Sequence, residues 1–345
     1  MDKDIKYLNM NNDVFVSICV PVYGVEKYIE RCAVSLFEQT YHNIEYVFVN
    51  DCTPDNSIEI LKDIIERYPE RKPNVRIICH DKNRGLAAAR NTAVDAVNTE
   101  FLMHVDSDDW VETDIVEKCV NKQLEGDYDI VSVDIIREWV KLSERIVLPN
   151  FKDSRDMTLK LLSRKSFHSI YGHLIRTSLY KDNNIRLDEG LNMGEDYFII
   201  PRLSYFAKKI VNIHKFLYHY NFQNENSYVS SFSEVKAEQE WKVSESLKNF
   251  FHDKEIDFIN AIFIADAYRI YMYIKECIKN HNDTYYVTMC ERLNGIDAKY
   301  INKLPLTSKL FLNLKYKSLR IIYFKIASNI KAFYRFYIMP MFLDK

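Results

Sequence analysis

The strongest constraint on the fold is an alternation of short apolar runs with amphipathic helical segments between residues 14 and about 126. The apolar runs are VFVSICVPVY, IEYVFVND, VRIICH and FLMHVD. The segments between them, EKYIERCAVSLFEQ, DNSIEILKDIIERY and RGLAAARNTAVDAV, have helical periodicity with charged outer faces. This order is typical of an α/β fold built on a mostly parallel sheet, and each run is predicted to be a buried strand.

The sequence after residue 126 predicts further strands and helices of the same domain, followed by a helical region. Strands are expected near 129–148, a helix near 155–165, and another helix from Glu195. From about residue 231 the pattern is almost entirely helical, with few Gly or Pro. We therefore predict a domain over residues 1–230 and a mainly α-helical C-terminal region over 231–345.

Cysteine usage and hydropathy favour a cytoplasmic protein. The seven cysteines are odd in number and lack CxxC spacing, which argues against a disulfide framework and a zinc site. The N-terminal residues lack the apolar core of a signal peptide. The longest stretch without Asp, Glu, Lys or Arg has 12 residues, 14–25, which is too short to span a bilayer.

The charge is unevenly distributed. The net charge is −2, but residues 303–345 carry nine Lys or Arg against one Asp, which is +8 and leaves −10 on the rest. In SKLFLNLKYKSLRIIYFKIASNIKAFYRFYIMPMF the cations are interleaved with aromatic residues. Such a helix lies in a membrane interface, next to a lipid-linked acceptor, or packs on protein with solvated cations. We expect no nucleic-acid partner, because no binding motif accompanies the basic run.

Carboxylates follow two of the predicted strands. Asp51 follows the second strand, and Asp106, Asp108 and Asp109 follow the fourth. Since α/β folds bind ligands beyond the carboxyl ends of their strands, a site is predicted there. Clusters of carboxylate oxygens suit Mg²⁺ or Mn²⁺, which in turn hold phosphate oxygens. An Asp-rich turn that caps the next helix is the alternative.

Four motifs in order carry a resemblance to a known family. They are PVYGVEKYIERCAVSLFEQTY, VNDCTPDNS, NRGLAAARN and DSDD. Together they resemble glycosyltransferase family 2, nucleotide-sugar-dependent enzymes that build bacterial surface polysaccharides. The resemblance is close over residues 14–122 and weaker to about 232, and it does not extend to the tail. It implies a GT-A catalytic domain, Rossmann-like with a mostly parallel central sheet.

The resemblance assigns donor-binding roles at the strand ends. Pro21, Tyr23 and Asp51 would frame the nucleobase and ribose, with Asp51 accepting a hydrogen bond from the uracil imide. An unpaired carboxylate after an apolar strand is costly, which also favours a ligand donor at Asp51. Asp106 and Asp108 would contact a ribose hydroxyl and hold Mn²⁺ or Mg²⁺ against the departing diphosphate.

Two arginines flank the third predicted helix start. Arg84 and Arg90 are six residues apart in NRGLAAARN. Free backbone N–H groups at a helix start and guanidinium forks both favour phosphate, so we expect both arginines to bind the donor. A structural ion pair between Arg90 and the aspartates is the alternative.

The motif NMGEDYF supplies candidates for the proton transfer. The resemblance makes Asp196 the general base and leaves Glu195 to orient the acceptor. Ordinary acidic charge at a helix N-terminus is the alternative reading.

The chain departs from the family pattern on the acceptor side. Tyr171, His173 and Leu174 stand where the family often has Trp-x-Lys-Leu, and Asn221 stands where an Arg often follows paired tyrosines. These departures put the identity of the acceptor in doubt more than the activity. His173 is either a packed polar residue or a ligand, and Trp110 either core or a wall of the sugar pocket.

The leading hypothesis is an inverting, metal-dependent hexosyl- or N-acetylhexosaminyltransferase. It would move a sugar from a UDP-sugar to a glycan or lipid-linked glycan of a bacterial surface polysaccharide, at the inner face of the cytoplasmic membrane. The alternative is a nucleotide-sugar-binding or scaffold protein of an assembly complex. A nucleotidyltransferase is disfavoured because PVYGVEKY lacks a Gly-rich loop. The oligomeric state, including a homo-oligomer, stays open.

Overall fold

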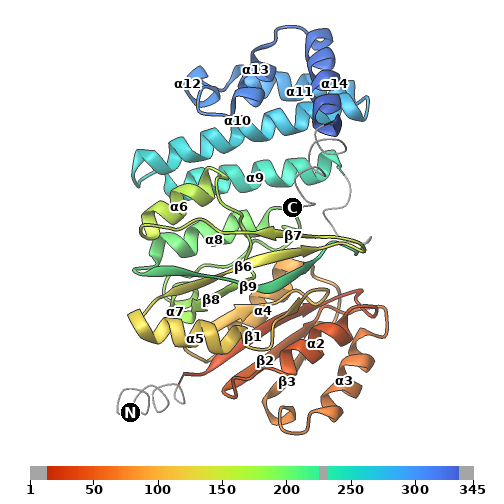
Figure 1. The fold of residues 1–345 in the computed structure, drawn as a ribbon, viewed down its shortest axis with the longest axis vertical. Helices are drawn as coiled ribbons and strands as arrows, with labels where there is room; N and C mark the ends of the chain where they lie inside the picture. The colour runs from red at the N-terminus through yellow and green to blue at the C-terminus, as the bar shows by residue number, and fades with distance from the viewer. Residues whose placement is uncertain (1–13, 225–231, 334–345) are drawn as a thin grey trace. The chain divides into compact units, whose positions relative to one another are not determined.

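The structure is a computed structural model that describes residues 14–224 and 232–333. The chain divides into two compact units (Figure 1). The first comprises Met1–Ser231 with Glu238–Ser246, and the second comprises Phe232–Ala237 with Leu247–Lys345.

The described part of the first unit contains one nine-stranded sheet with the order β3-β2-β1-β4-β8-β6-β9-β5 and β7 beside β6. Pairing is parallel among β1 to β4 and between β6 and β9, whereas β8, β5 and β7 pair antiparallel. The predicted mostly parallel sheet is therefore confirmed. The strands are β1 (Val16–Val22), β2 (Ile44–Asn50), β3 (Val75–Cys79), β4 (Phe101–His104), β5 (Trp110–Val111), β6 (Ile130–Glu138), β7 (Ser143–Ile146), β8 (His173–Arg176) and β9 (Ile210–Asn221).

Helices cover both faces of the sheet. Alternate residues of β1, Val16, Ile18, Val20 and Val22, belong to one apolar core that includes residues of α2, α3 and α5. The opposite face packs against α4, and Figure 1 shows α4 behind the sheet. The helices of this unit are α2 (Ile29–Phe37), α3 (Ser57–Arg67), α4 (Leu86–Ala96), α5 (Ile115–Gly126), α6 (Ser154–Leu162), α7 (Thr177–Lys181) and α8 (Glu195–Phe206).

The C-terminal part of the chain is helical, as predicted. Between residues 232 and 333 the structure contains helices and no strand. None of the helices in the described ranges is long and apolar enough to cross a membrane. These helices are α9 (Glu234–Phe251), α10 (Ile256–Lys279), α11 (Asp283–Asn294), α12 (Ala298–Ile301), α13 (Leu306–Asn313) and α14 (Lys317–Phe333).

One sequence prediction about the sheet was wrong. VRIICH was expected to be a buried strand, but β3 lies at the sheet edge and pairs only with β2. Arg76 and Cys79 are exposed and the other three residues of β3 are half-buried. The apolar sequence of one strand does not show whether the strand pairs on both sides or lies at the edge of the sheet.

The sheet brings the predicted site residues to one edge. Because β1 pairs in parallel with both β2 and β4, the carboxyl ends of these three strands lie at the same edge. Tyr23, Asp51 and Asp106 follow those ends within two residues. The topology therefore gathers side chains that are distant in the sequence.

Candidate active site

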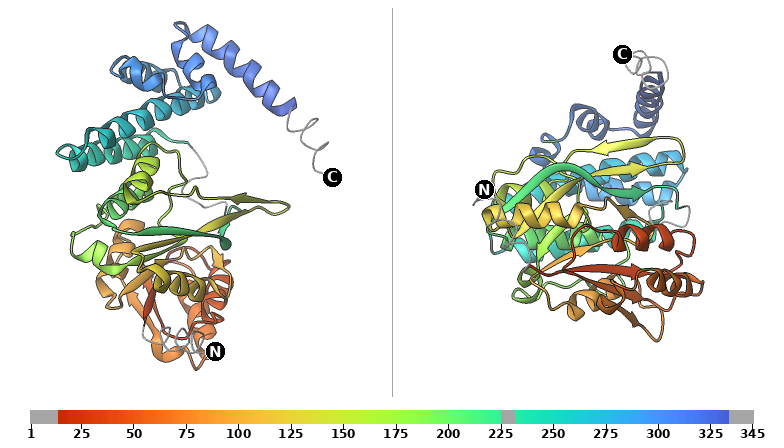
Figure 2. Two further views of the ribbon diagram at one scale, coloured as in Figure 1. Left: turned by 60° about the vertical axis from the view of Figure 1, so that its left-hand side comes forward. Right: turned by 60° about the horizontal axis from the view of Figure 1, so that its bottom comes forward.

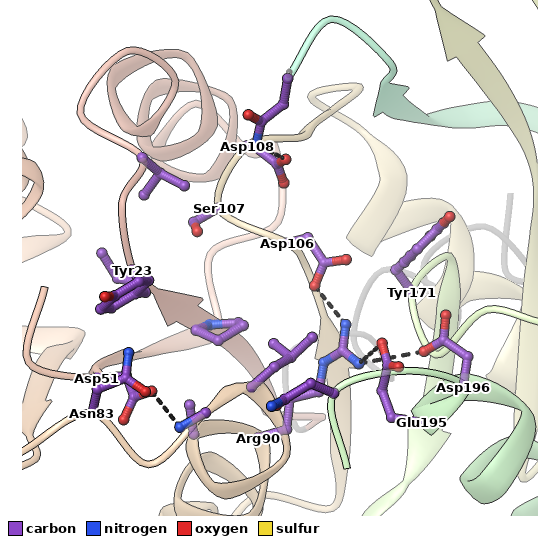
Figure 3. A pocket seen from close by; sticks show the side chains of 18 of the residues that line it. Tyr23, Asp51, Asn83, Arg90, Asp106, Ser107, Asp108, Tyr171, Glu195 and Asp196 are labelled. Carbon is purple, nitrogen blue, oxygen red and sulfur yellow. Dashed lines mark hydrogen bonds and ion pairs between the residues drawn. The ribbon is translucent and has the colours of Figure 1, made fainter. Parts of the chain in front are cut away.

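A pocket of about 470 Å³ lies at the carboxyl ends of β1, β2 and β4. Figure 3 shows Tyr23, Asp51 and Asn83 at one end of it, Asp106 and Arg90 in the middle, and Tyr171 and Asp196 at the other end. Eight of the nine predicted site residues line it, namely Pro21, Tyr23, Asp51, Arg90, Asp106, Asp108, Glu195 and Asp196.

Asp51 is buried, and its carboxylate already has hydrogen-bond donors within the protein, whereas the sequence predicted a carboxylate without a protein partner. It accepts hydrogen bonds from the backbone N–H groups of Arg84 (2.8 Å) and Gly85 (2.7 Å). His80 Nδ1 lies 2.7 Å from Asp51 Oδ1, and His80 Nε2 lies 2.9 Å from Thr92 Oγ1. Asp51 therefore fixes the turn between β3 and α4. Sequence reasoning missed His80, although it follows β3 as Asp51 follows β2.

The ninth predicted residue, Arg84, points elsewhere. Its guanidinium lies 2.5 Å from Glu189 Oε1, and the side chain is absent from the residues that line the pocket. The next residue, Gly85, has a φ of +88°, a conformation that favours glycine. A Cβ at Gly85 would also lie 2.8 Å from Asn192 Oδ1, so this turn fits closely against the segment before α8.

Arg90 on α4 joins the middle of the pocket to its far end. Its buried guanidinium lies 2.8 Å from Asp106 Oδ1, 3.1 Å from Glu195 Oε1 and 3.4 Å from Asp196 Oδ1. Burial alone would lower the pKa of Arg90, but the charges of Asp106, Asp196 and Glu195 raise it well above its ordinary value. The guanidinium is thus permanently charged, and the ion pair weighed as the alternative reading is present.

Asp109 anchors the loop after β4 to residues of β9. This fully buried carboxylate accepts hydrogen bonds from Tyr218 Oη (2.6 Å) and from the Asn221 backbone N–H (2.7 Å). Tyr218 Oη also accepts from the backbone N–H of Asp106 (3.1 Å), and Asn221 Nδ2 donates to the backbone oxygen of Asp108 (3.0 Å). The sequence could not distinguish this anchoring aspartate from its neighbours.

Asp108 is held in the pocket with one amide donor, Asn224 Nδ2, at 2.8 Å. Burial and the nearby charge of Asp106 raise the pKa of Asp108 to about 6. No Lys or Arg of the described ranges forms an ion pair with Asp108. The pair Asp106 and Asp108 is therefore a place where additional positive charge would be stabilised.

Glu195 and Asp196 begin α8, directly after Gly194, which is in the left-handed conformation. Burial raises the pKa of both carboxyl groups, and the charge of Glu195 raises that of Asp196 further, while Arg90 opposes both shifts. The Ile170 backbone N–H also stabilises the ionised form of Asp196. A buried carboxylate with a raised pKa is a stronger base when it is ionised.

Three further residues considered from the sequence, Tyr171, Trp110 and His173, differ in their relation to the pocket. Tyr171 lines the pocket, whereas Trp110 does not, since it lies between Arg31 (3.4 Å to the ring centre) and His219 (4.9 Å). His173 is a packed polar residue, with Nδ1 2.8 Å from Ser132 Oγ, and burial lowers its pKa to about 4.

A mostly parallel sheet with a carboxylate-lined pocket at its strand ends is the arrangement in which open α/β folds bind their ligands. Residues 17–182 match the family model described as Glycosyl transferase family 2, which confirms the predicted resemblance for that segment. A crystal structure of S. aureus TarS in complex with UDP-GlcNAc is similar, with a TM-score of 0.70, 20% identity and 92% of each chain covered. This likeness confirms the predicted GT-A fold.

Curated relatives match part of the chain. The uncharacterized glycosyltransferase EpsJ of Bacillus subtilis (strain 168) is 33% identical over 191 residues, which are 52% of this chain and 53% of EpsJ. The minor teichoic acid biosynthesis protein GgaB of the same organism is 28% identical over 231 residues, 65% of this chain and 25% of GgaB. The chain thus spans about half of the first relative and a quarter of the second.

Proposed function

We propose that the chain is an inverting, metal-dependent glycosyltransferase that moves a sugar from a UDP-sugar to a hydroxyl of a lipid-linked bacterial glycan. The observation that carries this proposal is a single pocket lined by a strand-end Asp51, the Asp106 and Asp108 pair, and the Glu195 and Asp196 pair. TarS in complex with UDP-GlcNAc and the teichoic acid protein GgaB support the choice of donor and acceptor class.

The end of the pocket near Asp51 would bind the nucleoside. A carboxylate has about four acceptor positions, and three are used by Arg84, Gly85 and His80. One position remains for an N–H of uracil or a ribose hydroxyl. The half-exposed ring of Tyr23 would cover the base.

Asp106 and Asp108 would hold Mn²⁺ or Mg²⁺, and their chemistry fits such an ion. Their oxygens are hard ligands, and a cation beside them would offset the burial and the charge of Asp106 that raise the pKa of Asp108. Within the described ranges no group of three or more His, Cys, Asp or Glu forms a metal site, so diphosphate and water oxygens would complete the coordination. When bound, the ion would neutralise charge on the departing diphosphate.

Asp196 would act as the general base. Its carboxylate would accept the proton of the acceptor hydroxyl as that oxygen attacks the anomeric carbon of the donor. The bond from this carbon to the diphosphate oxygen breaks, and UDP leaves with the electron pair. Attack from the face opposite the diphosphate inverts the anomeric configuration. Arg90, whose guanidinium contacts both carboxylates, would keep Asp196 in place, and Glu195 would orient the acceptor.

Release of UDP from UDP-glucose, UDP-galactose and UDP-GlcNAc tests this proposal without knowledge of the acceptor, because water replaces a sugar hydroxyl in slow hydrolysis. We expect release from at least one donor with Mn²⁺ or Mg²⁺ and none with EDTA. A protein that binds these donors but never releases UDP would instead be the nucleotide-sugar-binding scaffold.

The C-terminal segment would bring the pocket to a membrane that carries the acceptor. The exposed stripe of α14 consists of aliphatic residues, Leu319, Ile322 and Ile326, at helical spacing. Phe311 and Arg320 are buried within the second unit, so the packing alternative holds for these two residues. Residues from 334 onward lie outside the described residues.

A further inference from the structure

We propose that four aromatic side chains beside the pocket bind the sugar rings of a glycan acceptor. These residues, Tyr171, Tyr220, Phe222 and Trp139, are called the aromatic strip below. The inference rests on the proposed transfer reaction, and it adds that the acceptor is an oligosaccharide held over more than one sugar.

The strip follows one face of β9. Side chains two residues apart in an extended chain point to the same face, so Tyr218 and Tyr220 on β9 and Phe222, the residue directly after β9, form a row. The rings of Tyr220 and Phe222 are 5.3 Å apart. Exposure rises along this row, since Tyr218 is fully buried, Tyr220 is half-buried and Phe222 is 43% exposed. The row therefore runs from the core to a surface that a ligand can reach.

The neighbouring strand β6 extends the row. Arg137 pairs in register with Tyr220, and Trp139 lies two residues further on the same face. The rings of Trp139 and Phe222 are 4.9 Å apart, and the Phe222 backbone N–H donates to Glu138 O (2.8 Å). These contacts fix the outer rings relative to each other. The paired ends of β6 and β7, where Trp139 lies, project from the sheet (Figure 2).

The inner end of the strip is part of the pocket wall. Tyr171 and Tyr220 both line the pocket, and their rings are stacked 5.5 Å apart. Figure 3 shows Tyr171 near Asp196, at the end opposite Tyr23 and Asp51. A ligand on the strip would therefore approach the proposed base and not the nucleoside end.

The chemistry of the strip suits sugars better than a lipid surface. Pyranose rings carry faces of C–H groups that pack on aromatic faces, whereas their hydroxyls need polar partners at the edges. Arg137 supplies such a partner, with its guanidinium 5.1 Å from the Phe167 ring and 5.9 Å from that of Phe222. Glu144 forms an ion pair with Arg137 (3.2 Å) and adds negative charge beside it. A surface that carries charges of both signs binds an anionic membrane weakly, because such a membrane attracts cations and repels carboxylates.

The test measures binding to an array of defined bacterial surface oligosaccharides of one to six sugars, with UDP and Mn²⁺ present. The double variant Phe222→Ala/Trp139→Ala is compared with the native chain and with Phe15→Ala, an exposed phenylalanine before β1. Removing two rings is expected to weaken oligosaccharide binding about tenfold or more. Phe15→Ala is expected to bind as the native chain does, and Trp139→Phe to retain most of the affinity.

A second readout separates this proposal from the transfer reaction. Neither Phe222 nor Trp139 lines the pocket, so the rate of UDP release from a UDP-sugar in water should be unchanged in the double variant. If the native chain binds oligosaccharides but never releases UDP, the result contradicts the proposed function and supports the strip as a binding site. Equal array binding by native and double variant, or binding of no oligosaccharide, would overturn the strip proposal. So would a double variant that loses binding to anionic vesicles but not to oligosaccharides.

Discussion

Among single residues, Arg90 contacts the most charged groups of the pocket. It is the cation between Asp106 and the Glu195 and Asp196 pair, and its own exposure is minimal. Replacing it by glutamine leaves three carboxylates close together without their common partner. A buried charge stripped of its partner typically destabilises a protein by about 3–5 kcal/mol.

We therefore expect Arg90→Gln to lower the free energy of unfolding by roughly that amount and to abolish UDP release. Arg90→Lys keeps the charge but not the planar fork, so it should be intermediate in both respects. Urea unfolding and UDP release measure the two effects. An Arg90→Gln protein as stable and active as the native chain would contradict the bridging role.

Asp196 gives the sharpest test of the proton transfer. Asp196→Asn should leave UDP-sugar affinity nearly intact while turnover with an acceptor falls on the order of 10²–10⁴-fold, the usual range for a lost general base. Asp188→Asn is the matched control, an exposed aspartate of the preceding segment that does not line the pocket. Near-native turnover of Asp196→Asn would assign the base to Glu195 or another group.

The sequence predicted the site residues that follow strands directly, because strand ends and helix starts are local features. Tyr23, Asp51 and Asp106 belong to this class. It did not predict His80 as a partner of Asp51, or Tyr218 as a partner of Asp109, which is 109 residues away. Such pairs depend on strand order, which one sequence does not contain.

At the scale of elements, β6 and β8 are joined by a buried polar pair. His173 on β8 and Ser132 on β6 are adjacent in register, and the His173 imidazole is buried and neutral. Its pKa of about 4 lies below the ordinary value of 6.5 because burial disfavours the charged ring. The unfolded chain therefore takes up a proton at a higher pH than the folded protein does.

The contribution of His173 to stability is full above about pH 6.5 and is lost as the pH falls towards 4. Between about pH 6.5 and pH 4, we expect protonation of His173 to lower the free energy of unfolding of the native chain by on the order of 2–3 kcal/mol. The variant His173→Asn should be less stable at pH 7 but should lose less on acidification. His42→Asn, an exposed control, should follow the native curve. Parallel curves for His173→Asn and the native chain would contradict the assignment.

The periodicity of the first 126 residues predicted four strands and three helices close to their observed bounds. The later elements were less well specified, since β6 and β9 pair in parallel although they are separated by about 70 residues. The exposure of β3 also depends on its place at the sheet edge. Edge position and distant pairing are properties of the assembled sheet and not of the local pattern.

At the scale of the whole molecule, the exposed stripe of α14 bears on where the enzyme acts. Leu319, Ile322 and Ile326 are 43%, 54% and 55% exposed and share one helix face. Lys315 and Lys325 are exposed near them. This combination fits a helix that lies in the interface of an anionic membrane.

We expect Leu319→Ser/Ile322→Ser/Ile326→Ser to weaken partitioning to phosphatidylglycerol-containing liposomes by on the order of tenfold or more. Val287→Ser removes an equally exposed side chain from α11 and serves as the control. Co-sedimentation at graded anionic content measures the effect. If the native chain stays in the supernatant at every composition, the stripe does not bind membrane.

Calorimetry with UDP tests whether the pocket binds a UDP-sugar through the strand-end carboxylates and a divalent ion. The native chain and Asp108→Asn are titrated with UDP in the presence of Mn²⁺ and in EDTA. We expect Mn²⁺ to strengthen UDP binding to the native chain and to have little effect on the variant, because the neutral amide no longer holds the ion against the diphosphate. Equal Mn²⁺ dependence in both proteins, or no UDP binding by the native chain, would contradict this expectation.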